Sequence, residues 1–346
     1  MLRYLTAGES HGKALVAILE GMPAGLKVDE AKINQELKRR QQGFGRGERM
    51  QIERDKVQIL SGLKKGITLG SPIGILLGNK DFSIEKLPRV VCPRPGHADL
   101  AGFLKYGFTD VRCVLERASA RETASRVAIG AICKIFLAKF KIEVCSRVLS
   151  IAGEIESVAM RAKILKAKNS KDTVGGIFEV VASGVPCGLG SYVHSDRRLD
   201  GRLSQSIMSI PGIKAVEIGL GFGYADKFGS VSHDAIYYTK NKGYFRRTNN
   251  AGGIEGGVSN GEDIVIGACM KPISTLLEPL DSVNIITKKP GKASVQRSDI
   301  CVVEASGVVA ESACAFVLTD AFLEKFGSDN LIDIEKTYRD YLKRSK

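Results

Sequence analysis

Residues 119–136 read SARETASRVAIGAICKIF, and this stretch says most about the fold. Its first four residues fit the Ser-x-x-Glu capping box, and apolar side chains follow up to Phe136 with helical spacing. The pattern predicts an apolar helix that begins at the motif. A helix start offers free N–H groups and partial positive charge, so Arg121 in its first turn would strengthen an anion site. Plain capping with an exposed arginine is the simpler interpretation of this motif alone.

A second apolar helix is predicted over residues 308–326, ending at Gly327. Glu311 and Asp320 stand nine positions apart in it, which at about 100° per residue places them on opposite faces. Most positions from 313 to 323 are apolar, so we expect one of these carboxylates to be buried. A buried carboxylate with a raised pKa can act as a base. An exposed Asp320 on an irregular face is an equally good interpretation.

Shorter patterns complete the fold prediction. Residues 29–40 fit a helix in which Glu36 pairs with Arg40 and which ends near Gly43. Strands are indicated by β-branched runs at 57–60, 73–77, 178–182 and 264–267. The irregular mixture favours an α+β fold over a doubly wound sheet. Without a linker to divide it, the chain is expected to be a single domain over residues 1–346, and internal pseudo-symmetry is compatible with that.

The composition is typical of a water-soluble globular protein, with 44% hydrophobic and 26% charged residues. The most apolar stretch, residues 302–323, is interrupted by Glu304, Glu311 and Asp320, so no membrane span is expected. The N-terminus lacks the pattern of a secretory leader, which favours a cytoplasmic location. The eight cysteines never form a Cys-x-x-Cys pair, so we expect reduced, packed thiols and no metal site.

The net charge is +13, from 51 basic and 38 acidic residues, and could attract nucleic acid or a small anion. Much of the lysine excess falls in segments such as 161–171, which is typical of a solvated face. The arginines gather beside glycines instead. A nucleic-acid partner is not expected, because aromatic residues are only 6% and tryptophan is absent, which leaves no stacking platform.

Three glycine-bearing stretches concentrate the chemistry: residues 7–12 (AGESHG), residues 39–49 (RRQQGFGRGER), and the run from 94–97 (RPGH) to 119–122 (SARE). Glycine allows close backbone approach, guanidinium groups bind carboxylates and phosphates, and imidazole moves protons near neutral pH. Together they predict a pocket for a small polyanion in which protons are transferred. Residues 248–257 (TNNAGGIEGG) suit contact with a flat ligand or a phosphate, but they match neither common nucleotide-binding loop.

In order along the chain, these stretches resemble the chorismate synthase family. Further matching landmarks are 208–212 (MSIPG), 250–253 (NAGG), 271–275 (KPIST), 297–299 (RSD) and 318–321 (LTDA). The resemblance covers about residues 5–327 and leaves 328–346 peripheral. It implies a β-α-β sandwich, a homotetramer and the anti-1,4 elimination of phosphate and a C6 hydrogen from 5-enolpyruvylshikimate 3-phosphate. It also implies reduced FMN as a cofactor that is required but not consumed.

The resemblance further implies roles for individual residues. His97 would protonate the departing phosphate, His11 would protonate the flavin at N1, and Asp320 with flavin N5 would remove the C6 proton. The positions expected to bind the flavin are Arg49, Arg94, His97, Ser119, Ala120, Arg121, Asn250, Ala251, Lys271, Thr275, Arg297, Ser298 and Asp299. The positions expected to bind the substrate are Ser10, His11, Arg40, Arg46, Arg49, Arg94, Arg121 and Arg297.

Two departures and two alternatives accompany this interpretation. Ala118 stands where many family members have serine, and Glu304 where bacterial forms commonly have proline. A flavin-dependent oxidoreductase acting on a small polyanion is the main alternative, and an RNA-binding protein is the other. An external flavin reductase is the expected electron source, with NAD(P)H use by the chain itself left open.

Overall fold

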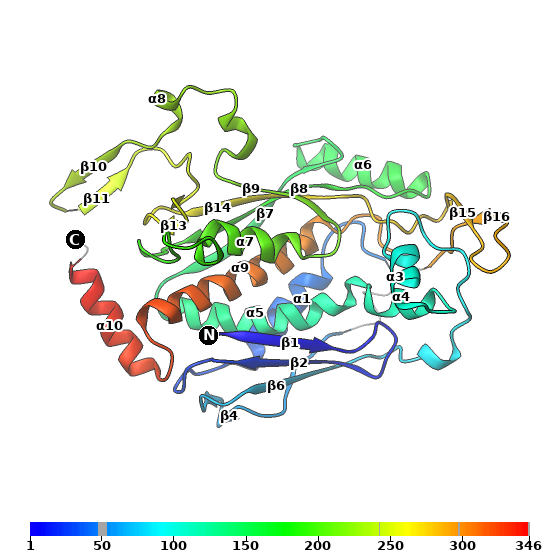
Figure 1. Cartoon of the computed structure of the whole chain (residues 1–346), viewed down its shortest axis with the longest axis horizontal. Helices are drawn as coiled ribbons and strands as arrows, with labels where there is room; N and C mark the ends of the chain where they lie inside the picture. The colour runs from blue at the N-terminus through cyan, green and yellow to red at the C-terminus, as the bar shows by residue number, and fades with distance from the viewer. Residues whose placement is uncertain (48–53, 242, 297, 345–346) are drawn as a thin grey trace.

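The computed structural model describes residues 1–47, 54–241, 243–296 and 298–344. Two four-stranded antiparallel sheets enclose a layer of helices (Figure 1). The first sheet has the order β1 (Arg3–Ala7), β2 (Ala14–Glu20), β6 (Ile73–Gly78) and β3 (Gln58–Ile59). The second has the order β7 (Glu143–Ile151), β8 (Gly176–Ser183), β14 (Ile264–Met270) and β9 (Ile213–Ile218). The α+β class is confirmed, while the internal pseudo-symmetry stays a prediction.

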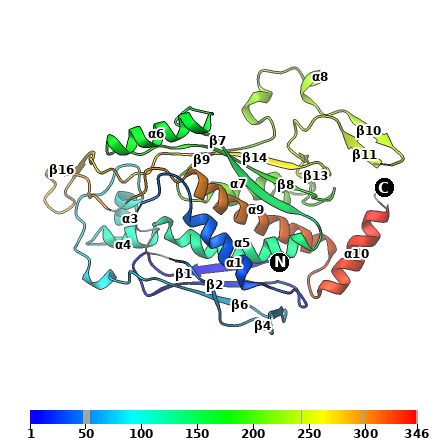
Figure 2. The same cartoon turned by 180° about the vertical axis from the view of Figure 1, so that it is seen from behind.

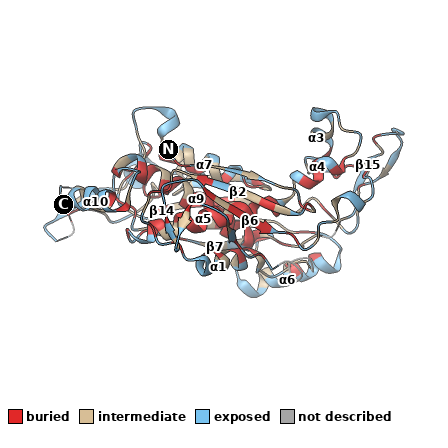
Figure 3. Ribbon diagram, turned by 90° about the horizontal axis from the view of Figure 1, so that it is seen from below, coloured by how far each residue is buried: buried red, intermediate tan, exposed pale blue. Residues whose placement is uncertain are grey.

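The helical layer consists of α1 (Glu30–Gln41), α5 (Thr123–Ala138), α7 (Leu199–Met208) and α9 (Val303–Phe326), as the reverse view also shows (Figure 2). Helix α9 is long and apolar enough to cross a membrane, but most of it is buried inside the protein (Figure 3). It packs so closely on α5 that a Cβ added to Gly130 would lie 2.3 Å from Ser312 Cβ. Helix α9 is therefore the core of the sandwich.

The start of α5 corrects the capping-box prediction. Ser119 Oγ accepts a hydrogen bond from Arg121 N at 3.3 Å and so caps a 3-10 turn, η2 (Ala120–Glu122). The α-helix begins only after it, at Thr123. Glu122 does not reach back to Ser119, because its carboxylate is held by Thr6 and by Arg126. Helix α9, likewise, begins five residues before the predicted position and ends before Gly327 as expected.

Helix α1 lies where it was predicted, capped by the Asp29 carboxylate. The predicted Glu36–Arg40 pair is wrong. Glu36 instead pairs with Arg39 of the same helix and with Lys134 of α5, and both of these also pair with Glu311 of α9. Arg40 turns to the other side of the helix and is buried. Arg39 and Arg40 are thus adjacent in the last turn of α1 but belong to different clusters: Arg39 pairs with Glu311, and Arg40 lies buried elsewhere.

The remaining elements flank the sandwich. Helices α3 (Asp99–Tyr106) and α4 (Arg112–Arg117) lie at the same end as the hairpin β15–β16, and α8 and the hairpin β10–β11 lie at the opposite end (Figure 1). The other helices are η1 (Ile84–Lys86), α6 (Ser157–Asn169), η3 (Ser195–Arg197), η4 (Gly221–Tyr224), α8 (Gly229–Ser232) and α10 (Leu331–Arg344). The hairpins are β4 (Leu63–Lys64) with β5 (Ile67–Thr68), β10 (Ile236–Thr239) with β11 (Gly243–Arg246), β12 (Ile254–Glu255) with β13 (Val258–Ser259), and β15 (Asp281–Val283) with β16 (Pro290–Lys292).

Strand β1 is the edge of the first sheet, and side chains cover its unpaired backbone groups. Arg117 donates to the carbonyl oxygens of Thr6 and Gly8, each at 2.9 Å. Asp320 accepts from the amide of Leu2 at 2.7 Å, just before the strand. Arg117 and Asp320, which are distant from β1 in the sequence, thereby contact this edge strand and the residues that flank it.

Candidate active site

The loop after β1 is held in a fixed shape by one asparagine. Gly8 adopts φ +108°, and a Cβ there would lie 2.4 Å from the carbonyl oxygen of Ala14, so only glycine fits. Asn79, just after β6, donates to the carbonyl oxygens of Gly12 at 2.7 Å and Glu9 at 3.2 Å. Its own oxygen accepts from Arg121 Nε at 2.9 Å. Asn79 therefore ties the loop that carries His11 to the arginine cluster.

His11 faces a carboxylate that the sequence motif did not include. Its Nδ1 lies 3.0 Å from Glu116 Oε1, and its backbone N–H donates to Glu116 Oε2 at 2.8 Å. The neighbouring Ser10 is buried and donates its amide to the carbonyl of Glu116. Ser119 Oγ donates to Ser10 Oγ at 3.2 Å, which joins this loop to the start of α5.

Arg40 and Arg121 share one buried carboxylate. Arg121 Nη1 donates to both oxygens of Asp55, at 2.7 and 2.8 Å, and Arg40 Nη1 lies 3.6 Å from Asp55. Arg40 also donates to Thr123 Oγ1 and to the carbonyl of Ala120, each at 3.0 Å. Burial lowers the pKa of Arg40 to about 10, with the charge of Arg121 adding to the effect and Asp55 opposing it. Asp55 therefore offsets the charge of these two arginines only in part.

Arg46 and Asp299 form a second pair close enough to act electrostatically on Arg40. Arg46 Nε lies 3.4 Å from Asp299 Oδ1, and the amide of Gly47 donates to the same oxygen at 2.5 Å. Ser298 Oγ donates to the carbonyl of Asp299 at 3.2 Å. Glycine is needed in this loop, because Gly45 adopts φ +92° and packs against Ile164 and Cys301.

Several guanidinium nitrogens of these arginines are buried without a hydrogen-bond partner in the described part of the chain. They are Nη1 of Arg40, Nε of Arg46 and Nη2 of Arg121. Such a donor costs about 1–3 kcal/mol when it is left unsatisfied, so native proteins rarely retain one without a function.

His97 lies in a second cluster at the start of α3. Its Nδ1 is 2.5 Å from Asp99 Oδ1, and Asp99 also accepts from the amide and the Nε of Arg94, at 3.0 and 2.8 Å. Burial alone would raise the pKa of Asp99, but the bonds from His97 and Arg94 outweigh it and hold that pKa well below its usual range. Arg94 reaches on to Thr275 Oγ1 at 2.7 Å.

Lys271 belongs to the same cluster. Its ammonium group donates to the carbonyl of Gly96 and, at 3.1 Å, to Ser274 Oγ. Burial lowers the pKa of Lys271, and the charge of Lys214 lowers it further. The KPIST stretch and the RPGH stretch are thus in contact.

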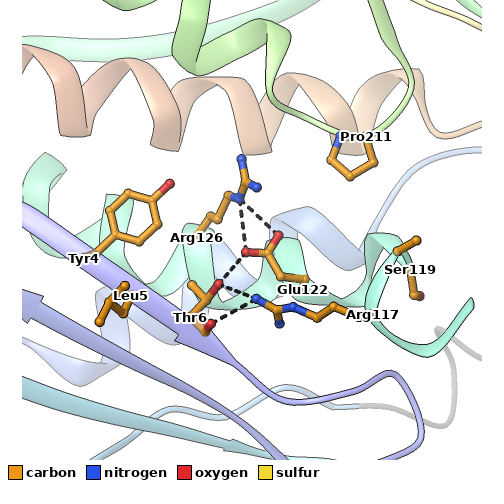
Figure 4. A pocket seen from close by; sticks show the side chains of 9 residues that line it. Tyr4, Leu5, Thr6, Arg117, Ser119, Glu122, Arg126 and Pro211 are labelled. Carbon is orange, nitrogen blue, oxygen red and sulfur yellow. Dashed lines mark hydrogen bonds and ion pairs between the residues drawn. The ribbon is translucent and has the colours of Figure 1, made fainter. Parts of the chain in front are cut away.

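A pocket of ≈ 360 Å³ opens beside Ser119 and the edge strand β1 (Figure 4). Glu122 lies between Thr6 Oγ1, at 2.8 Å, and Arg126 Nε, at 3.0 Å, so its charge is balanced. The full lining is Tyr4, Leu5, Thr6, Arg117, Ala118, Ser119, Glu122, Arg126 and Pro211. Its mixture of aromatic, aliphatic and guanidinium groups suits a flat anionic ligand.

Three of the expected site residues lie away from these clusters. Asn250 and Ala251 donate their amides to Asp234, each at 2.8 Å, in the part of the molecule that carries β10 and β11. Asp320 is ion-paired with Arg202. Asp320 also lies sixteen residues after Glu304 on α9, which is about 24 Å along the helix, and Glu304 is the residue that lies against Gly43. Arg49 and Arg297 lie outside the described residues.

The prediction of a buried base on α9 is also corrected. The buried carboxylate is Glu311, which is fully enclosed and bonded to Arg39, Lys134 and Ser146. Burial alone would raise the pKa of Glu311, but these partners outweigh it and lower that pKa. Glu311 is therefore an ionised structural group of the core.

Sequence reasoning missed Asp55, Asn79, Glu116 and Arg117. Each acts on a motif residue through contacts of long sequence separation, such as Asp55 with Arg121, so no local pattern marks them. The one available signal was the position of Glu116 and Arg117 directly before the SARE stretch.

Comparison with known proteins gives one consistent result. The sequence model described as chorismate synthase matches residues 2–323. The chorismate synthase of Thermoanaerobacter pseudethanolicus is 54% identical, covering 99% of this chain and 98% of that protein. The enzyme of Caldanaerobacter subterraneus subsp. tengcongensis is 53% identical over the same shares.

Solved structures agree. A crystal structure of chorismate synthase superposes with a TM-score of 0.82 at 41% identity, covering 100% of this chain and 98% of the other. Oxidoreductase and RNA-binding functions are thereby set aside in favour of a lyase of the shikimate pathway. With its fold, its arginine-rich site and its full-length relatives in agreement, the chain belongs to the chorismate synthase family.

Proposed function

We propose that Arg40, Arg46 and Arg121 bind the anionic groups of 5-enolpyruvylshikimate 3-phosphate. The observation that carries this proposal is the set of buried guanidinium nitrogens without a hydrogen-bond partner among the described residues. The substrate has two carboxylates and a phosphate, about four negative charges near pH 7. Charge-assisted bonds to such groups are about twice as strong as neutral ones, so a buried arginine cluster is well matched to them.

The described residues also fit a flavin phosphate and ring. The expected contacts from the two clusters are Arg94, His97, Ser119, Ala120, Arg121, Lys271, Thr275, Ser298 and Asp299. Ser119 borders the pocket beside β1, and Arg117 and Arg126 add positive charge there. When bound, reduced FMN supplies electron density transiently and takes it back, so it is required without being consumed.

His97 is proposed to protonate the leaving phosphate. Asp99 lies against Nδ1, so the proton that His97 is proposed to donate is the one at Nε2, beside which Arg94 Nη2 lies at 3.4 Å. Because Asp99 stays ionised, the ring keeps one tautomer and one orientation. Arg94 holds Asp99 from the other side and so fixes the loop.

The carboxylate that removes the C6 proton is proposed to be Asp299 rather than Asp320. Asp299 lies with Arg46 in the cluster, whereas Asp320 is engaged by Leu2 and Arg202 at the far end of α9. Asp55 is the other carboxylate among the described arginines, and two of them already engage it. We therefore propose that Asp320 supports the start of β1 structurally and does not remove the proton.

A second copy of the chain is proposed to complete the site. Asn250 and Ala251 match flavin-lining positions, yet they lie near β10 and β11, at the end of the molecule opposite α3 (Figure 1). The homotetramer that the resemblance implies would allow one subunit to present this loop to another. Cross-linking of a cysteine placed at Ala251 to a neighbouring subunit would support the proposal, and a fully active monomer would contradict it.

The experiment that tests the function is an anaerobic assay with 5-enolpyruvylshikimate 3-phosphate and FMN, with and without dithionite, following chorismate absorbance and phosphate release. Many turnovers per flavin, seen only when the flavin is reduced, would support the elimination and the unconsumed cofactor together. Consumption of reductant in step with substrate would favour the flavin-dependent oxidoreductase instead. Binding of reduced FMN without product would leave the pocket but overturn the substrate.

A further inference from the structure

Each site histidine is one member of an arginine–carboxylate–histidine triad. Arg94, Asp99 and His97 form one of them. The other is Arg112, Glu116 and His11, in which Arg112 Nη1 lies 3.6 Å from Glu116 Oε1. Glu116 is only 3% exposed and Arg112 only 6%. The same three residue types therefore surround each imidazole ring, which indicates a shared way of holding it.

The two triads differ in one respect. Asp99 is tightly shared, since Arg94 donates to it three times. Arg112 instead directs its Nε to the carbonyl of Pro88 at 2.7 Å, and its Nη1 makes no hydrogen bond within the described residues. The strongest bonds of Glu116 are therefore those to His11. Substitution of Glu116 should therefore perturb His11 while disturbing its arginine less than substitution of Asp99 would disturb Arg94.

We propose that Glu116 is the positioning residue of His11, holding the ring by Nδ1 so that the proton exchanged with the ligand is the one at Nε2. The inference rests on the proposed function of this site. Three contacts carry it: Glu116 receives the Nδ1–H and the backbone N–H of His11, and its own carbonyl receives the amide of Ser10. Nε2 of His11 makes no bond to another described residue.

The carboxylate has to be ionised to accept both bonds. Burial would raise the pKa of Glu116, but the side-chain and backbone bonds from His11 outweigh it, and Arg112 adds to them, so that pKa is lowered. An ionised acceptor at Nδ1 keeps a proton on that nitrogen whether or not Nε2 is protonated. Nε2 of His11 is therefore the nitrogen that gives and regains a proton in each cycle.

The first test reads the ring directly in the complete enzyme without turnover. Nitrogen-15 NMR of histidine-labelled protein, assigned with His11→Asn, should show Nδ1 of His11 protonated throughout the titration of Nε2. Glu116→Gln should produce a mixture of tautomers, and Glu179→Gln, which removes a carboxylate paired with Arg147 on the sheet, should not. A wild-type spectrum with Nδ1 unprotonated overturns the proposal, whether or not the variant folds.

The second test is a double-mutant cycle on turnover. Glu116→Gln should lower kcat about 10–100-fold, as loss of a group that orients a histidine commonly does, while substrate affinity from calorimetry with oxidised FMN stays within about threefold. Added to His11→Ala, it should cause no further loss. A further loss of similar size in the double variant would mean that Glu116 acts on the fold and not through His11. Failure of the proposed function would remove turnover from the wild type and leave the NMR result intact.

Discussion

Arg121 donates both of its short bonds to Asp55, at 2.7 and 2.8 Å, and leaves its other terminal nitrogen unpaired within the described chain. One carboxylate thus fixes the orientation of this cation. Asp55 is its counter-charge, and the Asp55 side chain is fully buried.

Asp55→Asn should destabilise the protein by about 3–5 kcal/mol, because it leaves Arg121 and Arg40 buried without their counter-charge. Urea unfolding measures the change. Asp281→Asn removes an exposed carboxylate paired with Lys292 and should leave the free energy of unfolding nearly unchanged. Equal stability of Asp55→Asn and the wild type would show that the two arginines need no fixed carboxylate.

Arg46→Gln should weaken substrate binding about 10–100-fold, because a buried charged donor to the substrate is lost. Calorimetry with oxidised FMN present measures binding without turnover. Arg147→Gln, at an exposed pair with Glu179, serves as the control and should bind normally. If both variants bind alike, the unpaired nitrogen of Arg46 has another purpose.

His97→Ala should lower turnover about 10²–10⁴-fold, the usual range for a general acid or base, while flavin binding stays nearly intact. Steady-state chorismate formation and flavin fluorescence titration measure the two quantities. Full activity of the variant would remove His97 from the mechanism.

Asp299→Asn and Asp320→Asn should separate the two candidate bases. We expect Asp299→Asn to lower kcat about 10²–10⁴-fold. Asp320→Asn should lower the melting temperature, because Arg202 loses its ion pair and the bond from Leu2 loses its charged acceptor, without a comparable loss of kcat. The reverse pattern would restore the role that the resemblance gave to Asp320.

Glu311 should make stability depend on pH on the acid side. Its pKa is lowered in the folded protein from the ordinary 4.5, so its contribution is fully present above about pH 4.5 and is lost as the pH falls through the folded pKa. Urea unfolding at several pH values should show a steeper acid loss for the wild type than for Glu311→Gln. Parallel curves would contradict the shift, and Glu20→Gln, at the exposed pair with Arg3, controls for loss of any carboxylate.

The sequence was sufficient for the parts of the fold that local patterns encode. Helix α1 and strands β6, β8 and β14 lie where periodicity and β-branching placed them, and α9 ends where predicted but begins five residues earlier. The capping box failed because Glu122 found stronger partners in Thr6 and Arg126 than the backbone of Ser119 offers. A partner such as Thr6 lies in another element of the fold, so the sequence around Glu122 does not reveal it.

The candidate site divides in the same way. His11 and His97 stand beside glycines, Arg40 opens the RRQQGFGRGER stretch and Arg121 belongs to the SARE stretch, so local motifs marked all four as candidates. The residues that orient them, Asp55 and Glu116 above all, become neighbours only through the fold. Asp320 shows a contact of the same kind, because its side chain accepts a hydrogen bond from the amide of Leu2, just before β1.

The guanidinium of Arg117 both borders the pocket beside Ser119 and occupies the carbonyl oxygens at the open edge of β1 (Figure 4). An exposed sheet edge is a template for pairing with other chains. Loss of Arg117 would therefore have two effects at once: it would change the lining of this pocket, and it would leave carbonyl oxygens at the sheet edge open to pairing with another chain.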